Sequence, residues 1–286
     1  MGIVLVLLSS LFFSLSAVFG KIVTSNWDVA GYVVSIGRFS LTALIMFIFM
    51  MTTKKSFKAN DPKPIIIRGI FNSLAIITYY MSFQYTTITN ANMLHMLYPG
   101  FIILLTPFFL KEKVNFSKYI YISFMLYGAY LIVNPRFNSI NLGDMLSLFS
   151  AVAASFSVMA LTQARKNDET SLVVFYVMLI ATFINLPLAY SGLFKLPVEA
   201  LPFFFLSSIC GTLGQVTMTF GYKLVDSSTG ALISSSRIVV TTLIGVIFLA
   251  EPMNLRILSA MTITTICLIG ISGYFQKRFS LNRKHT

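Results

Sequence analysis

Five long stretches of the chain contain no charged residue, and they constrain the fold more than any other feature. Each runs for 19 to 22 residues, and together they cover residues 2–20, 145–164, 171–190, 201–222 and 257–276. A helix of about 20 apolar residues spans the ~30 Å hydrocarbon core of a bilayer. The stretches therefore predict an all-α polytopic membrane protein.

Composition agrees with this prediction. Of the 286 residues, 56% are hydrophobic and 10% are charged, whereas an ordinary soluble domain carries roughly 25% charged residues. The net charge of +12 could indicate nucleic-acid binding. However, the lysines and arginines lie mostly between the apolar stretches, as membrane topology requires. We therefore expect a lipid bilayer and a small-molecule substrate as partners, and no nucleic acid.

The cysteines and the N-terminus add two further expectations. Cys210 and Cys267 both lie inside apolar stretches, so we interpret them as packing residues, with no disulfide framework and no zinc site. The first apolar stretch has no basic segment before it, so we expect a retained helix and no cleaved signal peptide. Nothing in the sequence indicates a cofactor, and the oligomeric state stays open.

We predict ten transmembrane helices. The stretch 69–110 contains 42 residues, which is too long for one crossing, so we divide it at 85–90, where threonines and asparagines suit a turn and an N-cap. The predicted helices cover residues 2–22, 30–52, 64–84, 90–110, 117–134, 143–164, 170–190, 201–222, 228–250 and 255–276.

The distribution of lysine and arginine predicts the orientation. Fourteen of these residues lie in the loops and tail on one side of the predicted membrane, and four lie on the other. Lysine and arginine accumulate on the cytoplasmic side. Both termini are therefore predicted to be cytoplasmic, and the basic tail, 277–286, is expected to lie near anionic lipid.

The chain also repeats itself. Residues of the first predicted helix recur 141 positions later in the sixth: Gly2 with Gly143, Ser9 with Ser150, Ser14 with Ser155, and Ser16 with Ser157. A second match, Leu110-x-Glu112 with Leu249-x-Glu251, has a nearly equal offset of 139. We infer two five-helix repeats, 1–140 and 141–276. An odd number of spans places them in opposite orientations, and inverted repeats are common in secondary transporters, whose site lies near the midplane.

At these residues the sequence resembles the drug/metabolite transporter superfamily, specifically its EamA-type branch. The resemblance rests on the ten spans, the Leu-x-Glu exits, Tyr79 and Tyr80 near the end of the third helix, and Pro99 within the fourth. It implies an inner-membrane carrier of small metabolites, with a central cavity lined chiefly by helices 1–4 and 6–9. One departure is Ile238, which stands where a second mid-helix proline would match Pro99.

All nine acidic residues fall in loops or at helix ends. The ionisable residues inside the predicted membrane are instead Arg38, Arg68, His95 and Arg237. Arg237 is ten residues into the ninth predicted helix. An arginine at a helix centre costs roughly 2.5–3.5 kcal/mol on insertion scales, so we expect it to face a wet cavity. Its planar fork can bind a carboxylate or phosphate with two hydrogen bonds. Alternatively, it is a structural arginine bonded to carbonyls or to a neighbouring amide.

The other two arginines lie nearer the ends of their helices. Arg38 faces either the cavity or the interface, since a long side chain near an end can reach the headgroups. Arg68 lies four residues inside its helix, so we expect it to reach the interface. If it instead faces inward, Asn72 lies one turn deeper on the same face.

His95 and Tyr98 share a helix face, and the offset of 139 pairs Tyr98 with Arg237. These three residues are thus expected at one level, with a substrate or proton role for His95, or a packing role. Softer candidates, each equally readable as a helix–helix hydrogen bond, are Tyr79, Tyr80, Asn92 and Gln215.

The leading hypothesis is a secondary transporter of a small metabolite that bears an anionic group. The alternative is a zwitterionic or amphipathic cationic metabolite, such as an amino acid, S-adenosylmethionine or a drug-like cation, held against Tyr79 or Tyr80. An intramembrane enzyme would need paired aspartates, a serine with a base, or zinc ligands, and the predicted spans lack these patterns. A receptor would not readily explain inverted halves with buried cations.

Overall fold

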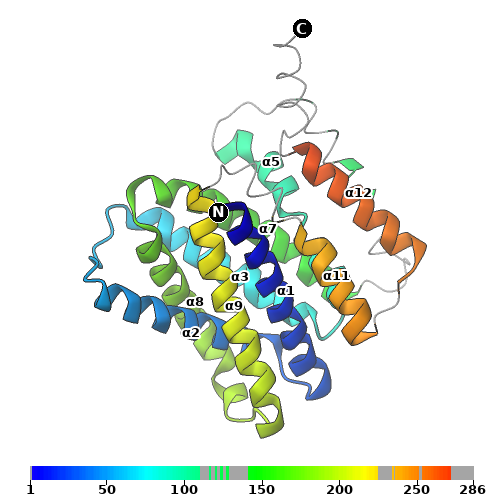
Figure 1. The fold of residues 1–286 in the computed structure, drawn as a ribbon, viewed down its shortest axis with the longest axis horizontal. Helices are drawn as coiled ribbons and strands as arrows, with labels where there is room; N and C mark the ends of the chain where they lie inside the picture. The colour runs from blue at the N-terminus through cyan, green and yellow to red at the C-terminus, as the bar shows by residue number, and fades with distance from the viewer. Residues whose placement is uncertain are drawn as a thin grey trace.

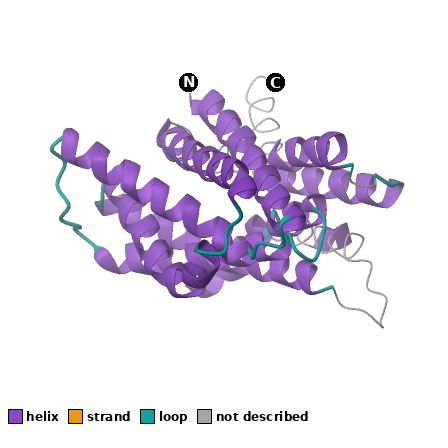
Figure 2. Cartoon of the chain, turned by 90° about the horizontal axis from the view of Figure 1, so that it is seen from below, coloured by secondary structure: helices purple, strands orange, loops and turns teal. Residues whose placement is uncertain are grey.

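The computed structural model describes residues 2–109, 116, 120, 123–124, 127–128, 141–224, 234, 236–250 and 253–271. Within these residues the chain is a bundle of α-helices joined by short loops, with no β-strand (Figure 2). Six of the described helices are long and apolar enough to cross a membrane. The prediction of an all-helical, multi-pass membrane protein is confirmed at this level.

Two of the described helices begin at a side-chain N-cap. Thr87 accepts a hydrogen bond from the backbone N–H of Asn90 at 3.1 Å, and Asn141 accepts one from Gly143 at 2.8 Å; both are N-caps. The elements are α1 (Gly2–Asn26), α2 (Gly31–Thr52), α3 (Pro62–Ser82), α4 (Ile88–His95), α5 (Tyr98–Phe109), α7 (Leu142–Asn167), α8 (Thr170–Leu193), η1 (Val198–Ala200), α9 (Leu201–Leu224), α11 (Ser236–Leu249) and α12 (Leu255–Ile271).

The predicted helix 90–110 is wrong as one continuous helix, because the structure breaks it into α4 and α5 at Met96 and Leu97. Pro99 explains the break. Proline has no N–H to donate to the carbonyl four residues earlier, which is that of His95, and its ring disfavours a helical conformation at the preceding residue. After the break, the Gly100 N–H donates to the carbonyl three residues earlier, that of Leu97, at 2.9 Å.

Some sequence predictions lie outside the described residues. They are most of the predicted span 117–134, the start of the predicted span 228–250, Glu112 and Glu251 of the repeated exits, and the tail 277–286. In the described part, the other predicted spans agree with helices whose ends differ by a few residues.

Helices from the two ends of the chain interlock. In Figure 1, α1 lies beside α9 in the middle of the bundle, with α2 and α8 on one flank and α11 and α12 on the other. The largest hydrophobic cluster joins α1, α2, α3 and α8, and a second joins α4, α7 and α12. Both clusters therefore contain residues from both sides of the boundary between the predicted repeats.

The contacts across this boundary come in matched pairs. α1 packs on α9 as α7 packs on α3, and α2 packs on α9 as α8 packs on α3. The Ser16 hydroxyl donates to the Ser207 carbonyl at 2.7 Å, and the Ser157 hydroxyl lies 3.5 Å from the Arg68 carbonyl. Ser157 follows Ser16 by 141 residues, and Ser207 follows Arg68 by 139, which are the offsets found in the sequence.

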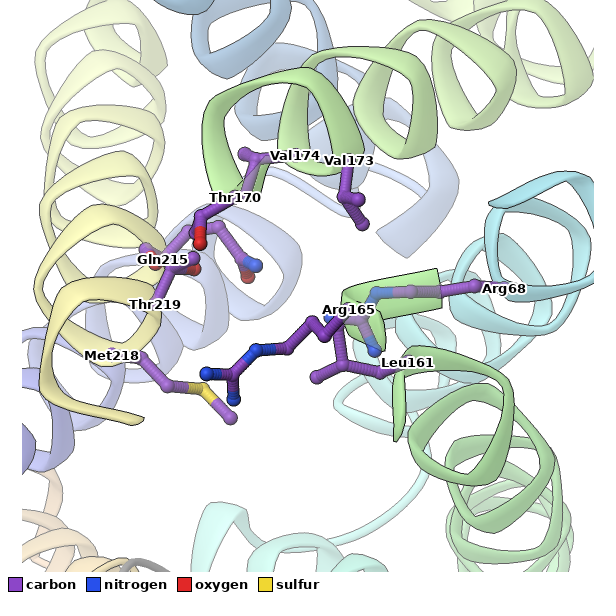
Figure 3. A pocket seen from close by; sticks show the side chains of 9 residues that line it. All are labelled: Arg68, Leu161, Arg165, Thr170, Val173, Val174, Gln215, Met218 and Thr219. Carbon is purple, nitrogen blue, oxygen red and sulfur yellow. Dashed lines mark hydrogen bonds between the residues drawn. The ribbon is translucent and has the colours of Figure 1, made fainter. Parts of the chain in front are cut away.

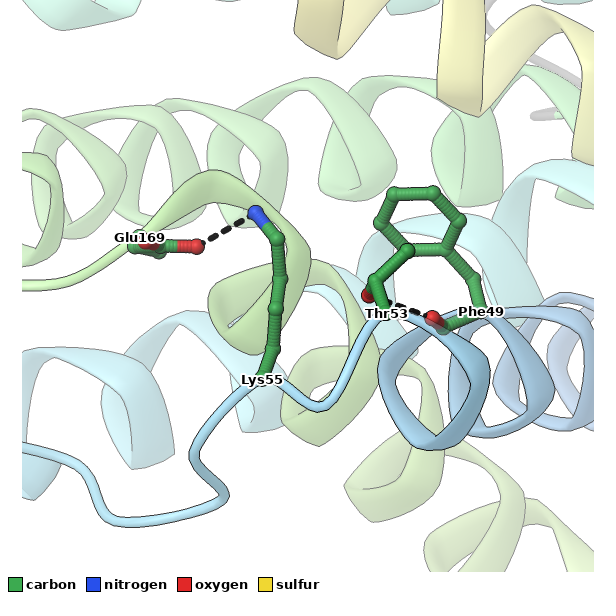
Figure 4. A network of polar contacts seen from close by, with 4 residues as sticks. All are labelled: Phe49, Thr53, Lys55 and Glu169. Atoms are coloured by element: carbon green, nitrogen blue, oxygen red, sulfur yellow. Dashed lines mark hydrogen bonds and ion pairs between the residues drawn. The ribbon is translucent and has the colours of Figure 1, made fainter.

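A polar tie holds the loop after α2 against the turn between α7 and α8. Lys55 and Glu169 form an ion pair at 2.6 Å, which is drawn in Figure 4. The Asp168 carboxylate accepts hydrogen bonds from the backbone N–H groups of Asn60 at 2.7 Å and Asp61 at 3.1 Å. The exposed ion pair contributes little stability on its own, but the two backbone bonds fix the path of the loop.

The close contact of Gly31 with the end of α3 allows a test of this packing. A Cβ atom on Gly31 would overlap backbone atoms of Tyr80 and Met81, which cannot rotate away. We expect Gly31→Ala to destabilise the protein by about 1–3 kcal/mol, the usual cost of overpacking, measured as a lower unfolding temperature in detergent. The control is Gly192→Ala, whose added Cβ meets mainly a methyl group of the Val33 side chain. Equal unfolding temperatures for the two variants would contradict the backbone contact.

Candidate functional site

A cavity lies where the two ends of the chain interlock. It is lined by side chains from α1, α2, α3, α7 and α9, together with residues of α4, α5 and α11. Of the eight residues that the sequence offered as substrate contacts, six line it, namely Arg38, Tyr79, His95, Tyr98, Gln215 and Arg237.

The other two candidates from the sequence, Tyr80 and Asn92, are not part of the cavity lining. Tyr80 is 1% exposed, and its hydroxyl lies 2.7 Å from the Ser16 hydroxyl, which joins α3 to α1. Asn92 is fully buried and does not line the cavity. Both residues make hydrogen bonds between helices in this structure.

Arg237 is held by a closed loop of hydrogen bonds. Its Nη2 donates to the Tyr79 hydroxyl at 3.2 Å, and that hydroxyl donates to Asn92 Oδ1 at 3.4 Å. Asn92 Nδ2 donates in turn to the Arg237 carbonyl at 3.4 Å. The loop joins α3, α4 and α11, so one orientation of the guanidinium is fixed by three helices.

Phe13 of α1 supports two arginines at once. The guanidinium carbon of Arg38 lies 4.7 Å from the centroid of the Phe13 ring, and that of Arg237 lies 5.3 Å from it. Arg237 also lies 5.4 Å from the Tyr79 ring. Such cation–π contacts stabilise a desolvated guanidinium. Arg38 is 6% exposed, so of the two positions that the sequence allowed, the structure has the one facing the cavity.

Arg68 corrects an expectation. The sequence favoured a side chain that reaches the membrane interface, but Arg68 is 6% exposed, lines the cavity, and donates from Nη1 to the Ser157 carbonyl at 3.2 Å. The reason is the close packing of α3 on α7, which offers this side chain a carbonyl partner in the interior. Asn72 lines the same cavity, as the inward alternative required.

Several nitrogen donors in the lining have no hydrogen-bond partner among the described residues. These are Arg38 Nε, Asn72 Nδ2 and Arg237 Nε, and all three atoms are buried. Leaving a buried donor unpaired costs about 1–3 kcal/mol, and such groups in native structures call for a ligand or water. The lining thus presents donors that lack acceptors.

The described acidic residues do not neutralise these groups, since none of them lines the cavity. Asp144 is 5% exposed, but its carboxylate accepts a hydrogen bond from the Thr86 hydroxyl at 2.8 Å, away from the lining. Asp168 and Glu169 are engaged in the loop tie. The described lining of the cavity therefore combines three guanidinium groups with no carboxylate.

His95 contributes an acceptor. The Ser150 hydroxyl donates its one proton to the Ala75 carbonyl at 2.6 Å, so at its 2.8 Å contact with His95 Nδ1 it must accept. The proton of a neutral imidazole then lies on Nδ1, and Nε2 keeps a lone pair. Because His95 lines the cavity between Tyr79 and Tyr98, at ring-centroid distances of 4.7 and 6.0 Å, that lone pair can accept a hydrogen bond from a ligand.

A second, smaller pocket of about 370 Å³ adjoins the cavity and shares Arg68, Gln215 and Met218 with it. Figure 3 shows the Arg165 side chain extending from α7 across this pocket toward Met218 on α9. The pocket lies at the end of the bundle where α7 ends and α8 begins.

Polar and aromatic contacts lie beyond Tyr79, toward the end of α3. Lys21 donates from Nζ to the carbonyls of Phe83 and Thr86, the latter at 3.0 Å. The Phe83 ring packs on those of Tyr79 and Tyr80, with centroids 4.8 and 5.2 Å away. These contacts join α1 to the end of α3.

Sequence reasoning missed Phe13 and did not assign Asn72 or Ser157 to the site. Phe13 is an ordinary apolar residue in an apolar helix, so no local signal marked it. Ser9 and Ser157 were recognised only as members of the repeat, yet both line the cavity together with Ser10. Their facing toward a cavity depends on the helix rotation, which apolar sequence does not fix.

The His95 geometry predicts an unusual tautomer. The chain has two histidines, His95 and His285, so ¹⁵N-histidine labelling gives two resolvable sets of signals. We expect His95 to carry its proton on Nδ1, and Ser150→Ala to shift it toward Nε2 because the acceptor is lost. Ser155→Ala is the control, since Ser155 bonds only within α7 among the described residues, to the Val152 carbonyl. Identical spectra for the wild type and Ser150→Ala would contradict the assignment.

Comparisons with known proteins agree with a transporter. The pseudopaline exporter CntI of Pseudomonas aeruginosa is 25% identical over 250 residues, which are 86% of this chain and 84% of that protein. Solute carrier family 35 member G1 of Mus musculus is 24% identical over 84% of this chain and 69% of its own length. A solved crystal structure has the same fold, with a TM-score of 0.62, 16% identity and coverage of 95% of this chain and 94% of the other. The model of the EamA-like transporter family matches residues 1–134 and 141–273, and the chain belongs to that family.

Proposed function

We propose that this protein is a secondary transporter of a small metabolite that bears an anionic group, working by alternating access at a midplane site between two repeats. The observation that carries the proposal is the cavity lined by Arg38, Arg68 and Arg237 and by no described carboxylate. A buried positive charge is costly unless it is paired. An anionic substrate supplies the missing partner.

Two inverted repeats, within ten transmembrane helices, are the second part of the proposal. The family model matches the chain twice, once in each half. The paired contacts of α1 with α9 and of α7 with α3 support the same division. Two copies in opposite orientation place equivalent surfaces on opposite sides of the membrane, which is how repeats of this kind produce alternating access.

The proposed orientation has both termini in the cytoplasm, in the plasma (inner) membrane. It rests on the excess of lysine and arginine on one side, fourteen against four. The pocket with Arg165 then lies at the cytoplasmic end, and the Lys21 contacts lie at the opposite end.

Each group in the lining has a role in substrate binding. The Arg237 guanidinium, oriented by Tyr79, binds a carboxylate or phosphate, and Arg38 adds a second positive charge beside Phe13. His95 Nε2 accepts a hydrogen bond from a hydroxyl or amine of the same molecule. Tyr98 and Gln215 complete the polar wall.

The alternative, a zwitterionic or cationic metabolite held on tyrosines, has weaker support. The Tyr79 and Phe13 rings already contact Arg237 and Arg38. A substrate cation on either ring would compete with a guanidinium and add to the positive charge. A zwitterion could instead place its carboxylate at Arg237 and its amine near His95. The similarity to an exporter of pseudopaline supports transport of a metabolite.

A thermal-stability panel tests the proposal. Anionic, zwitterionic and cationic metabolites at equal concentration are added to the purified protein in detergent. A ligand that binds only the folded state at a hundred times its Kd raises stability by about 2.7 kcal/mol. We expect stabilisation by carboxylates or phosphates, and roughly 10- to 100-fold weaker binding in Arg237→Ala, because a charged hydrogen-bond partner is lost.

Two further variants control this experiment. Arg237→Lys keeps the charge but loses the fork and should retain part of the affinity. Lys195→Gln removes an exposed positive charge outside the cavity and should change nothing. Stabilisation by cations alone, unchanged in Arg237→Ala, would overturn the anion site.

A further inference from the structure

We propose that the substrate carries two anionic groups, one near each end of an elongated molecule, which the cavity binds at two separate positive poles. This inference rests on the proposed function and refines its substrate class. The first pole is formed by Arg237 and Arg38, and the second by Arg68. All three residues line one cavity.

The first pole is compact. Arg38 and Arg237 contact the same Phe13 ring, so their guanidinium groups lie close enough to bind one anionic group together or in turn. Arg237 is additionally fixed by the Tyr79 hydroxyl. The Nε atoms of both arginines are buried and have no hydrogen-bond partner among the described residues.

The second pole lies well away from the first. Arg68 and Tyr79 are both on α3, eleven residues apart, which is about 16 Å along a helix axis. The Arg68 guanidinium does not reach toward Tyr79, because its Nη1 donates to the Ser157 carbonyl. The Ser157 hydroxyl in turn lies 3.5 Å from the carbonyl of Arg68 itself. Arg68 is therefore held level with its own backbone.

A polar contact lies between the two poles. Asn72 is one turn from Arg68 toward Tyr79, lines the cavity, and has a buried Nδ2 with no described partner. A single carboxylate or phosphate is much shorter than the separation of the poles and can contact only one of them at a time. A molecule with an anionic group at each end can contact both, with Asn72 donating to an oxygen between them.

The charge balance supports two anionic groups over one. The described lining contains three guanidinium groups and no carboxylate. One monovalent anion would leave most of this charge unpaired in a region of low dielectric constant, where unpaired charge is costly. Two anionic groups, whether carboxylates or phosphates, pair the two poles at once.

The experiment compares dianions with matched monoanions. The probes are adipate, suberate and sebacate, each against its monoamide, and alkane bisphosphonates against monophosphonates for phosphate-like chemistry. Apparent Kd is measured from thermal stabilisation of the full-length protein. We expect sebacate to bind at least about tenfold more tightly than its monoamide, with the preference growing from adipate to sebacate.

Variants at the second pole make the test specific. Arg68→Gln should remove the preference for dianions, because it should weaken the binding of each dianion much more than that of its monoamide. Lys63→Gln, an exposed residue of the same helix, should keep the preference, as should Arg68→Lys. If Arg68→Gln does not fold, the length series in the wild type and in Arg68→Lys still decides the question.

Three outcomes oppose the proposal in different ways. Equal affinity of dianions and monoamides in the wild type would overturn the two-pole site while leaving the anion transporter intact. Equal weakening of dianions and monoamides in Arg68→Gln would also overturn the two-pole site, because Arg68 would then contribute to the binding of a single anionic group. Binding of cations with no binding of any anion would overturn the proposed function itself.

Discussion

Burial of guanidinium groups among apolar helices is the constraint on which the rest of this structure depends. An arginine in the middle of a membrane-spanning helix costs about 2.5–3.5 kcal/mol on insertion scales, so each one must gain compensating contacts. Arg38 and Arg237 contact aromatic rings, Arg237 also contacts a tyrosine hydroxyl, and Arg68 contacts a backbone carbonyl. These partners are neutral. They hold the guanidinium groups in place and leave the net charge of the cavity positive.

The sequence was sufficient to predict the parts of the fold that depend on hydrophobicity alone. Helices α1, α7, α8, α9 and α12 lie where uncharged apolar stretches predicted them, and α2 and α3 lie where predicted spans with a single arginine did. The family was also predicted and is confirmed by the model that matches both halves of the chain. Arg237 and His95 could be found because an ionisable residue inside an apolar stretch is costly and needs a reason.

What the sequence could not predict depends on side-chain direction and on local breaks. Arg68 is long enough to reach the interface or the interior, and only the packing of α3 on α7 decides between them. Phe13 has many apolar neighbours in the sequence and nothing to distinguish it. The division of α4 from α5 required knowing that Pro99 ends one helix and does not merely bend it. The tautomer of His95 depends on Ser150, which is 55 residues away in the chain.

Three hydroxyl contacts join the two halves of the chain and add to the cost of some motions of this bundle. Ser14 with Thr241, Thr42 with Thr212, and Ser16 with Ser207 each join a helix of the first half to a helix of the second. Pulling the two halves apart as rigid blocks would break all three contacts in a medium that offers no water to replace them. Helices that tilt or rotate in place keep them. Halves that interlock in this way therefore favour small, concerted helix rotations over separation of two large bodies.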